Sequence, residues 1–203
     1  MKKRDIISAL IIGEICALIL ILIAGSLKIP SNIKDFMKFL PLMLPALSAL
    51  GIWFVSLFEN KMPVLFQAAK SFLVGILNTF IDLGILTVLM ETFQIFEGLN
   101  YLIFVGTSFS AATLNSYFWN KLWTFEKKGA EVDLKQTSKF YLITIGGLLI
   151  HLAVTSFMVN FWGPQFGISK EIWAYVGKMV AVFLGFIWNF TGYKFIVFKD
   201  KNG

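Results

Sequence analysis

Residues 72–90 form the run FLVGILNTFIDLGILTVLM, which is long and apolar enough to cross a lipid bilayer as a helix. The run nevertheless holds Asn78 and Asp82, which lie one helical turn apart on the same face. An ionisable side chain near the bilayer centre costs roughly 3 kcal/mol on insertion scales. Such side chains typically bind something or line a polar cavity, although a polar pair can also serve only to join two helices. We therefore take Asn78 and Asp82 as candidate substrate-binding residues, with helix packing as the alternative.

The composition indicates an all-α integral membrane protein. Of the 203 residues, 57% are hydrophobic and only 15% are charged, too few charges to cover a soluble domain of this size. The net charge of +6 comes from basic residues placed between apolar runs, which is typical of membrane loops rather than of a nucleic-acid-binding patch. We therefore expect the lipid bilayer, and no nucleic acid, as the surroundings of this chain.

Six segments meet the requirement of about 20 mostly apolar residues, namely 6–27, 38–58, 71–92, 101–123, 139–161 and 172–195. The first lacks an Ala-x-Ala-like cleavage site and is expected to stay as a membrane helix rather than to be removed as a signal peptide. The polar connections are short and carry no glycine-rich phosphate loop or HExxH motif. We expect no enzymatic activity and no cofactor, and the single Cys16 excludes an internal disulfide.

The distribution of basic residues predicts that both termini lie in the cytoplasm. With the N-terminus inside, the outer loops hold only Lys28, Lys34, Lys38 and Lys170, and the other loop Lys and Arg residues lie inside. An excess of Lys and Arg marks cytoplasmic loops.

The last four predicted helices contain an internal repeat. The segment 70–86 aligns without gaps with 139–155, which places Asp82 opposite His151. The segment 116–125 aligns with 189–198, which matches Lys121 to Lys194. We therefore expect a four-helix domain of two parallel helical-hairpin repeats over residues 70–199, with a site near the repeat interface. Residues 1–69 would form an accessory transmembrane hairpin.

Three further helices carry narrow polar stripes. The sixth has Lys178, Ala181, Gly185, Asn189 and Gly192; the fifth has Thr144, Gly147, His151 and Thr155; the fourth has Gly106, Ser110, Thr113, Tyr117 and Asn120. Each stripe recurs at three- and four-residue steps, so it lies on one helix face. Lys178 could equally snorkel to the outer interface. His151 as a lone histidine is more often a packing residue than a ligand, and no ligand cluster predicts a metal site.

The predicted cytoplasmic ends mix aromatic residues with lysine. NKLWTFEKK (120–128) contains Asn120 and Lys121, and GYKFIVFKD (192–200) contains Lys194. Such ends commonly anchor a helix at the interface. The alternative is that Lys121 and Lys194 bind a lipid phosphate. Glu14, in the first helix, is expected to pair with another helix or another subunit, which leaves a homo-oligomer open.

Several of these pieces resemble the GtrA-like family of small membrane proteins: FLVGILNTFIDLGI (72–85), LNSYFWNKLWTF (114–125), the Gly-Gly pair 146–147 and GKMVAVFLGFIWNFTGYKFIVF (177–198). The family motif falls here on Asn78, Thr79, Asp82, Asn120, Lys121, Trp123, Phe125, Lys178 and Asn189. The chain departs from the family pattern at Tyr193-Lys194, where the motif's Asn is missing, and in the extra hairpin 1–69.

The resemblance implies that the chain moves a polyprenyl-phosphate-linked sugar across the bacterial cytoplasmic membrane, for polysaccharide or teichoic-acid glycosylation. It further implies a membrane glycosyltransferase as partner. Asn78 and Asp82 would then bind sugar hydroxyls and Lys178 the phosphate, with Asp82 and Lys178 paired in the empty site. Two other functions stay open: a non-transporting anchor or activator of a glycosyltransferase, and a small proton-coupled exporter with Asp82 as the proton site.

Overall fold

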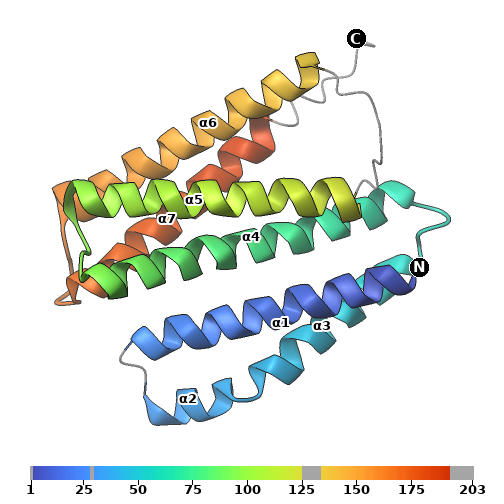
Figure 1. Ribbon diagram of the computed structural model, residues 1–203, viewed down its shortest axis with the longest axis horizontal. Coiled ribbons are helices and arrows are strands. Elements are labelled where there is room, and N and C mark those ends of the chain that lie inside the picture. The colour runs from blue at the N-terminus through green and yellow to red at the C-terminus, as the bar shows by residue number, and fades with distance from the viewer. Residues whose placement is uncertain (1, 28–29, 125–133, 193–203) are drawn as a thin grey trace. The chain divides into compact units, whose positions relative to one another are not determined.

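The computed structural model of the chain describes residues 2–27, 30–124 and 134–192, with the side chains of 32, 134–141, 189–190 and 192 outside the description. Every regular element in this part is helical, which confirms the all-α prediction. The elements are α1 (Lys3–Ser26), α2 (Ser31–Met37), α3 (Leu40–Ser56), α4 (Pro63–Phe93), α5 (Gly98–Trp119), the π-helix η1 (Asn120–Thr124), α6 (Leu134–Ser156), the π-helix η2 (Phe157–Trp162) and α7 (Lys170–Gly192) (Figure 1).

Among the described residues, four stretches of helix are long and apolar enough to span a membrane: Lys3–Ser26, Pro63–Phe93, Leu142–Trp162 and Lys170–Trp188. The chain is therefore a multi-pass membrane protein. The other two predicted spans do not meet this criterion. Helix α3 has 17 residues, one turn short of the usual span of about 20. Helix α5 has 22 residues, which is long enough, but its serines, threonines and asparagines lower its hydropathy.

The chain forms two compact units. The first consists of Met1–Val88 and Ser110–Lys128, and the second of Leu89–Phe109 and Gly129–Gly203. The first unit thus includes residues on both sides of the predicted domain boundary at 69 and 70. The assignment of 1–69 as an accessory hairpin and of 70–199 as the four-helix domain stays a prediction.

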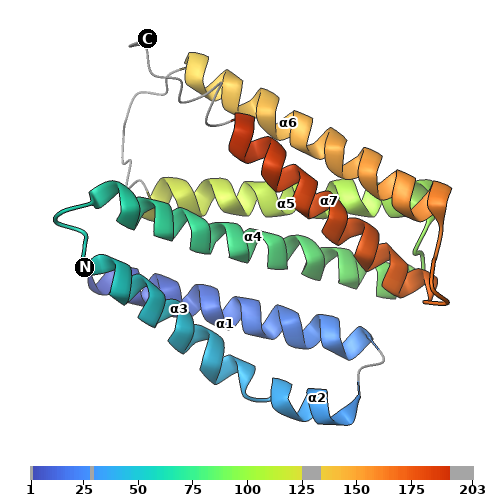
Figure 2. The ribbon, with the colours of Figure 1, turned by 180° about the vertical axis from the view of Figure 1, so that it is seen from behind.

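In the first unit, α1 and α4 lie side by side and run in the same direction (Figures 1 and 2). The Asp5 carboxylate is 2.6 Å from Lys70 Nζ at one end. Two turns before the end of α1, Ile19 packs against Gly84, where an added Cβ would come within 2.8 Å of Ile19 Cγ2. Both pairs are separated by the same 65 positions (70 minus 5, 84 minus 19). A constant offset is the signature of a parallel pair in fixed register.

This parallel arrangement requires the chain to return between α1 and α4, and α3 is the helix that brings it back. Helix α3 packs against α1 where Gly13 meets Pro45, with a hypothetical Gly13 Cβ only 2.5 Å from Pro45 Cα. Helix α5 returns in the same way, because it starts five residues after α4 ends and Asn120, directly after it, bonds to Ser71 near the start of α4. The path of the chain thus supports α3 and α5 as the two remaining spans.

In the second unit, α6 and α7 pack through glycines that receive large side chains. A Cβ on Gly146 would lie 2.7 Å from the Trp188 ring, and one on Gly177 would lie 2.8 Å from Val159 Cγ2. Two hydrogen bonds join α5 to the rest of this unit near the start of the helix. The Tyr101 hydroxyl donates to the Ala174 carbonyl at 2.9 Å, and the Gly98 amide donates to Asn160 Oδ1 at 2.6 Å. These contacts hold the start of α5 against α7 and η2.

Candidate functional site

Asn78 and Asp82 lie on the same face of α4, inside a candidate membrane span. Asp82 is buried, with 4% of its surface exposed. Asn78 is half-buried, and its Oδ1 atom is buried without a hydrogen-bond partner in the part of the chain that the structure describes. Gly75, one turn earlier, is exposed and has no neighbour within 4 Å of a hypothetical Cβ. The predicted polar face therefore becomes more buried from Gly75 towards Asp82.

His151 lies in the α6–α7 contact of the second unit. Its imidazole ring is 4.7 Å from the Phe109 ring, and its Nε2 atom occupies the space beside Gly185, 2.5 Å from where a Cβ would be. Its Nδ1 atom is buried without a hydrogen-bond partner among the described residues, and the same is true of Thr155 Oγ1 one turn further along α6. The stripes predicted on α6 and α7 thus face each other at His151 and Gly185, and this face retains unused hydrogen-bonding capacity.

Lys178 is fully buried in α7, with no exposed surface, and its Nζ atom is buried too. A snorkelling lysine keeps its ammonium group in water. The burial of Nζ therefore favours an internal role for Lys178 over the interfacial alternative. Asp82 belongs to the first unit and Lys178 to the second, so the predicted pairing of the two side chains stays a prediction.

Asn120 and Lys121 occupy the start of η1, directly after α5. The Asn120 side-chain amide donates to the Ser116 carbonyl at 3.0 Å, and its Oδ1 accepts from the Ser71 hydroxyl at 3.1 Å. Lys121 is exposed, with its Nζ 3.4 Å from the Tyr117 hydroxyl and 5.5 Å from the centre of that ring. Asn120 is therefore held in place, while Lys121 presents its charge outward.

A buried ionic cluster that the sequence analysis missed lies beside η1. Asp5 Oδ1 accepts hydrogen bonds from Lys70 Nζ at 2.6 Å and from Trp123 Nε1 at 3.1 Å. Asp5 Oδ2 accepts from the Lys2 amide at 2.9 Å. The Lys70 ammonium group also lies 4.6 Å from the centre of the Phe66 ring. The sequence offered one signal, an acidic residue at the start of an apolar helix, but nothing in it indicated the partner.

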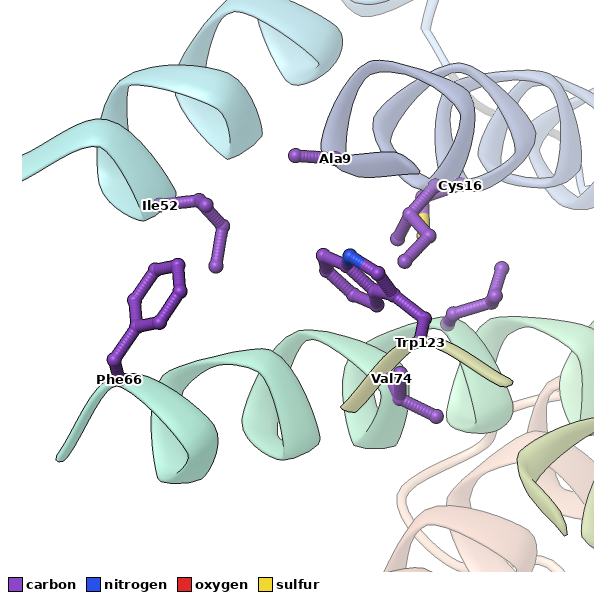
Figure 3. Close-up of a cluster of buried hydrophobic side chains, with 8 residues drawn as sticks. Ala9, Cys16, Ile52, Phe66, Val74 and Trp123 are labelled. Atoms are coloured by element: carbon purple, nitrogen blue, oxygen red, sulfur yellow. The ribbon is translucent and has the colours of Figure 1, made fainter. Parts of the chain in front are cut away.

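An apolar cluster surrounds this ionic pair. Figure 3 shows Trp123 between Ala9 and Cys16 of α1 and Val74 of α4. The cluster also contains Ile12, Ile52, Phe66 and Leu77. The low dielectric of such surroundings makes the Asp5–Lys70 attraction stronger than at a surface, and it makes loss of either partner costly.

The polar stripe predicted on the fourth helix does not face the interior throughout. Ser110 and Tyr117 are exposed, whereas Tyr101, Val105 and Ser108 are buried, with 0% exposed surface each. A role of this stripe in the predicted site near the repeat interface stays a prediction.

Two predicted site residues lie outside the description. Lys194 is beyond the described residues, and of Asn189 only the backbone, in α7, is described. Their assignment as substrate-binding residues therefore stays a prediction. Among the described residues, no three His, Cys, Asp or Glu side chains gather as a potential metal-ligand set.

Residues 70–198, well over half of the chain, match the family described as GtrA/DPMS, transmembrane domain. The chain belongs to this family. The GtrA/DPMS domain contains all eight predicted site residues, as well as Lys70 and Trp123, whereas Asp5 lies outside it. A similar protein is the "Uncharacterized membrane protein YngA" of Bacillus subtilis (strain 168), 32% identical over 128 residues, or 63% of this chain and 76% of the relative. No solved structure matches the chain.

Proposed function

We propose that the chain translocates a polyprenyl-phosphate-linked sugar across the bacterial cytoplasmic membrane, with both termini in the cytoplasm. One observation supports this proposal most. The domain at residues 70–198 belongs to the GtrA/DPMS family, and it buries Asp82 and Lys178 inside apolar membrane spans. Buried ionisable residues in spans mark substrate pathways more often than they serve packing, because their insertion is costly.

The chemistry of these side chains suits the two halves of such a substrate. The Asn78 Oδ1 atom, like Nδ1 of His151 and Oγ1 of Thr155, has hydrogen-bonding capacity that no described residue uses, and sugar hydroxyls could use it. A carboxylate such as Asp82 accepts hydrogen bonds from the same hydroxyls. Lys178 would hold the phosphate as a compact positive charge. The polyprenyl tail needs no protein path, because it can stay in the lipid.

The end of the domain at η1 would receive the lipid before it is moved. Lys121 is exposed there and can attract a phosphate, and Asn120 is held next to it by Ser71 and Ser116. Lys194, which the internal repeat aligns with Lys121, would take the same role on the other hairpin, and Asn189 of the family motif would bind the substrate as well. A membrane glycosyltransferase that makes the lipid-linked sugar is the expected partner, and this chain would carry out no chemical reaction of its own.

A flipping assay with purified protein tests this function. The protein is reconstituted alone into liposomes that carry a fluorescent polyprenyl-phosphate sugar in both leaflets, and a membrane-impermeant reductant bleaches the outer leaflet. A flippase makes the inner pool accessible, so bleaching proceeds to completion. Bleaching that stops at the outer pool, as in empty liposomes, would contradict translocation. Stimulation of a co-reconstituted glycosyltransferase without flipping would instead indicate an anchor or activator.

A further inference from the structure

The Asp5 carboxylate is the point where α1, α4 and η1 are joined. Its side chain is 1% exposed and accepts hydrogen bonds from three groups: Lys70 Nζ, the Trp123 indole N–H and the Lys2 amide. Asp5 comes from the accessory hairpin, outside the GtrA/DPMS match, whereas Lys70 and Trp123 belong to the matched domain. A residue outside the family domain thus completes a polar cluster inside it.

Trp123 links this cluster to the proposed lipid-phosphate site. Trp123 lies in the π-helical turn Asn120–Thr124, two residues after Lys121. Its indole is buried, with 2% exposed surface, whereas Lys121 is exposed, so the two side chains leave the turn in different directions. A π-turn is an unfavourable local conformation that commonly marks a functional site, and tertiary contacts must hold it in place. Here Asn120 holds one end of the turn, through Ser71 and Ser116, and Trp123 holds the other, through Asp5.

We propose that Asp5 is a positioning residue for the lipid-phosphate site at Asn120 and Lys121. Its carboxylate fixes the indole of Trp123 and thereby sets the rotation of η1, which determines where the Lys121 ammonium group points. The identity of the ligand rests on the proposed function. The accessory hairpin is then a working part of the site and not a passive addition to the four-helix domain.

The charge of Asp5 has two separate tasks in this arrangement. One is to neutralise Lys70, which is buried between Asp5 and the Phe66 ring. The other is to accept the hydrogen bond of Trp123, whose indole N–H lies in an apolar cluster and would be costly to leave unpaired. Variants can separate the tasks. Trp123→Phe removes the indole donor and part of the ring volume but leaves the Asp5–Lys70 pair in place, whereas Asp5→Asn removes the charge and Asp5→Glu retains it.

The experiment measures binding of a sugar-free polyprenyl phosphate to the full-length protein in nanodiscs. We expect Asp5→Asn and Trp123→Phe each to weaken binding about tenfold, which corresponds to about 1.4 kcal/mol. The double variant should bind no more weakly than Trp123→Phe alone, because Asp5→Asn weakens, and Trp123→Phe removes, the same contact between Asp5 and Trp123. Asp5→Glu should recover most of the affinity. Asp35→Asn, which removes an exposed carboxylate of the same hairpin paired with Lys38, should bind as the wild type does.

The outcomes separate this inference from the proposed function. Wild-type affinity in Asp5→Asn and in Trp123→Phe would overturn the positioning role, even if amide exchange of residues 116–124 became faster. Additive losses in the double variant would overturn it as well. If Asp5→Asn fails to fold, the binding affinity of Trp123→Phe is the test of the positioning role, because this variant keeps the Asp5–Lys70 pair intact. If wild-type protein binds polyprenyl phosphate with the expected variant pattern but flips no lipid-linked sugar, translocation fails while the positioning role of Asp5 stands.

Discussion

Asp5 of α1 and Lys70 of α4, which are 65 positions apart in sequence, form an ion pair of 2.6 Å, with both side chains at most 5% exposed. A buried pair of this kind is weak evidence for stability, because desolvation of the two charges offsets much of their attraction. It is better evidence for specificity, since only one register of α1 on α4 brings the two charges together. The same register seats Ile19 on Gly84 at the other end of the contact.

The ion pair predicts that the stability of the protein depends strongly on both Asp5 and Lys70. Lys70→Met leaves the Asp5 carboxylate buried without its cation, and we expect a loss of about 3 kcal/mol in the free energy of unfolding. The double variant Asp5→Asn with Lys70→Met should lose much less than the sum of the single variants. Thermal unfolding in mild detergent measures both, with Lys38→Met in the exposed pair with Asp35 as the control. Strictly additive losses would show that the pair contributes no coupling.

Substitution of Gly185 by a larger residue is predicted to cause a steric clash with His151. Gly185→Ala would put a Cβ within 2.5 Å of His151 Nε2, and we expect a destabilisation of about 1–3 kcal/mol. Gly75→Ala is the matched control, because nothing lies within 4 Å of its Cβ position, and its stability should be unchanged or slightly higher. Thermal unfolding of both variants checks this. Equal stabilities would mean that α6 and α7 do not pack as described.

The predicted topology can be tested by cysteine labelling in intact cells. Cys16 is buried and is the only cysteine, so Cys16→Ser gives a background without thiols. In that background, Phe166→Cys in the exposed loop between η2 and α7 should react with an impermeant maleimide. Asn60→Cys, in the loop between α3 and α4, should react only after the membrane is opened. The opposite pattern would place both termini outside and overturn the orientation.

The predicted pairing of Asp82 with Lys178, which the sequence analysis proposed, can be tested through the effects of substitutions on stability. Asp82→Asn removes the charge but keeps the shape, and Lys178→Met replaces the ammonium stem with an apolar chain of similar length. If the two charges pair, each single change leaves the other charge buried and unpaired, and the double variant is less destabilised than the sum. A double-mutant cycle of thermal unfolding measures this coupling. Additivity would rule out the pair without affecting a role for either residue in binding.

The sequence predicted the helical membrane class and a charge inside the span around Asp82, because both follow from local composition. The run around Asp82 is apolar enough to be identified as a membrane span, and a charged side chain inside a span is expected to face the protein interior and not the lipid. Helix boundaries were less accurate. Helix α4 begins at Pro63 rather than at residue 71, because proline suits the first turn of a helix.

Long-range contacts could not be predicted in this way. Asp5 gives no sign in the sequence that its partners are Lys70 and Trp123, since their meeting depends on the register of α1 on α4. The π-helical turn at Asn120 was also missed, because such turns are imposed by tertiary contacts and not by local propensity. Polarity also does not indicate which side of α5 is buried, since the buried Ser108 bonds back to Val105 of its own helix.

The flipping rate of Asp82→Asn, compared with the wild type at equal protein-to-lipid ratio, tests the central claim most directly. Liposomes carrying a fluorescent polyprenyl-phosphate sugar are bleached from outside, and Asp35→Asn serves as an exposed-carboxylate control. If Asp82 binds the sugar along the path, wild-type and Asp35→Asn protein should flip the lipid at the same rate, and Asp82→Asn at least about tenfold more slowly. An unchanged rate in Asp82→Asn, with its fold intact, would contradict a substrate path through Asp82.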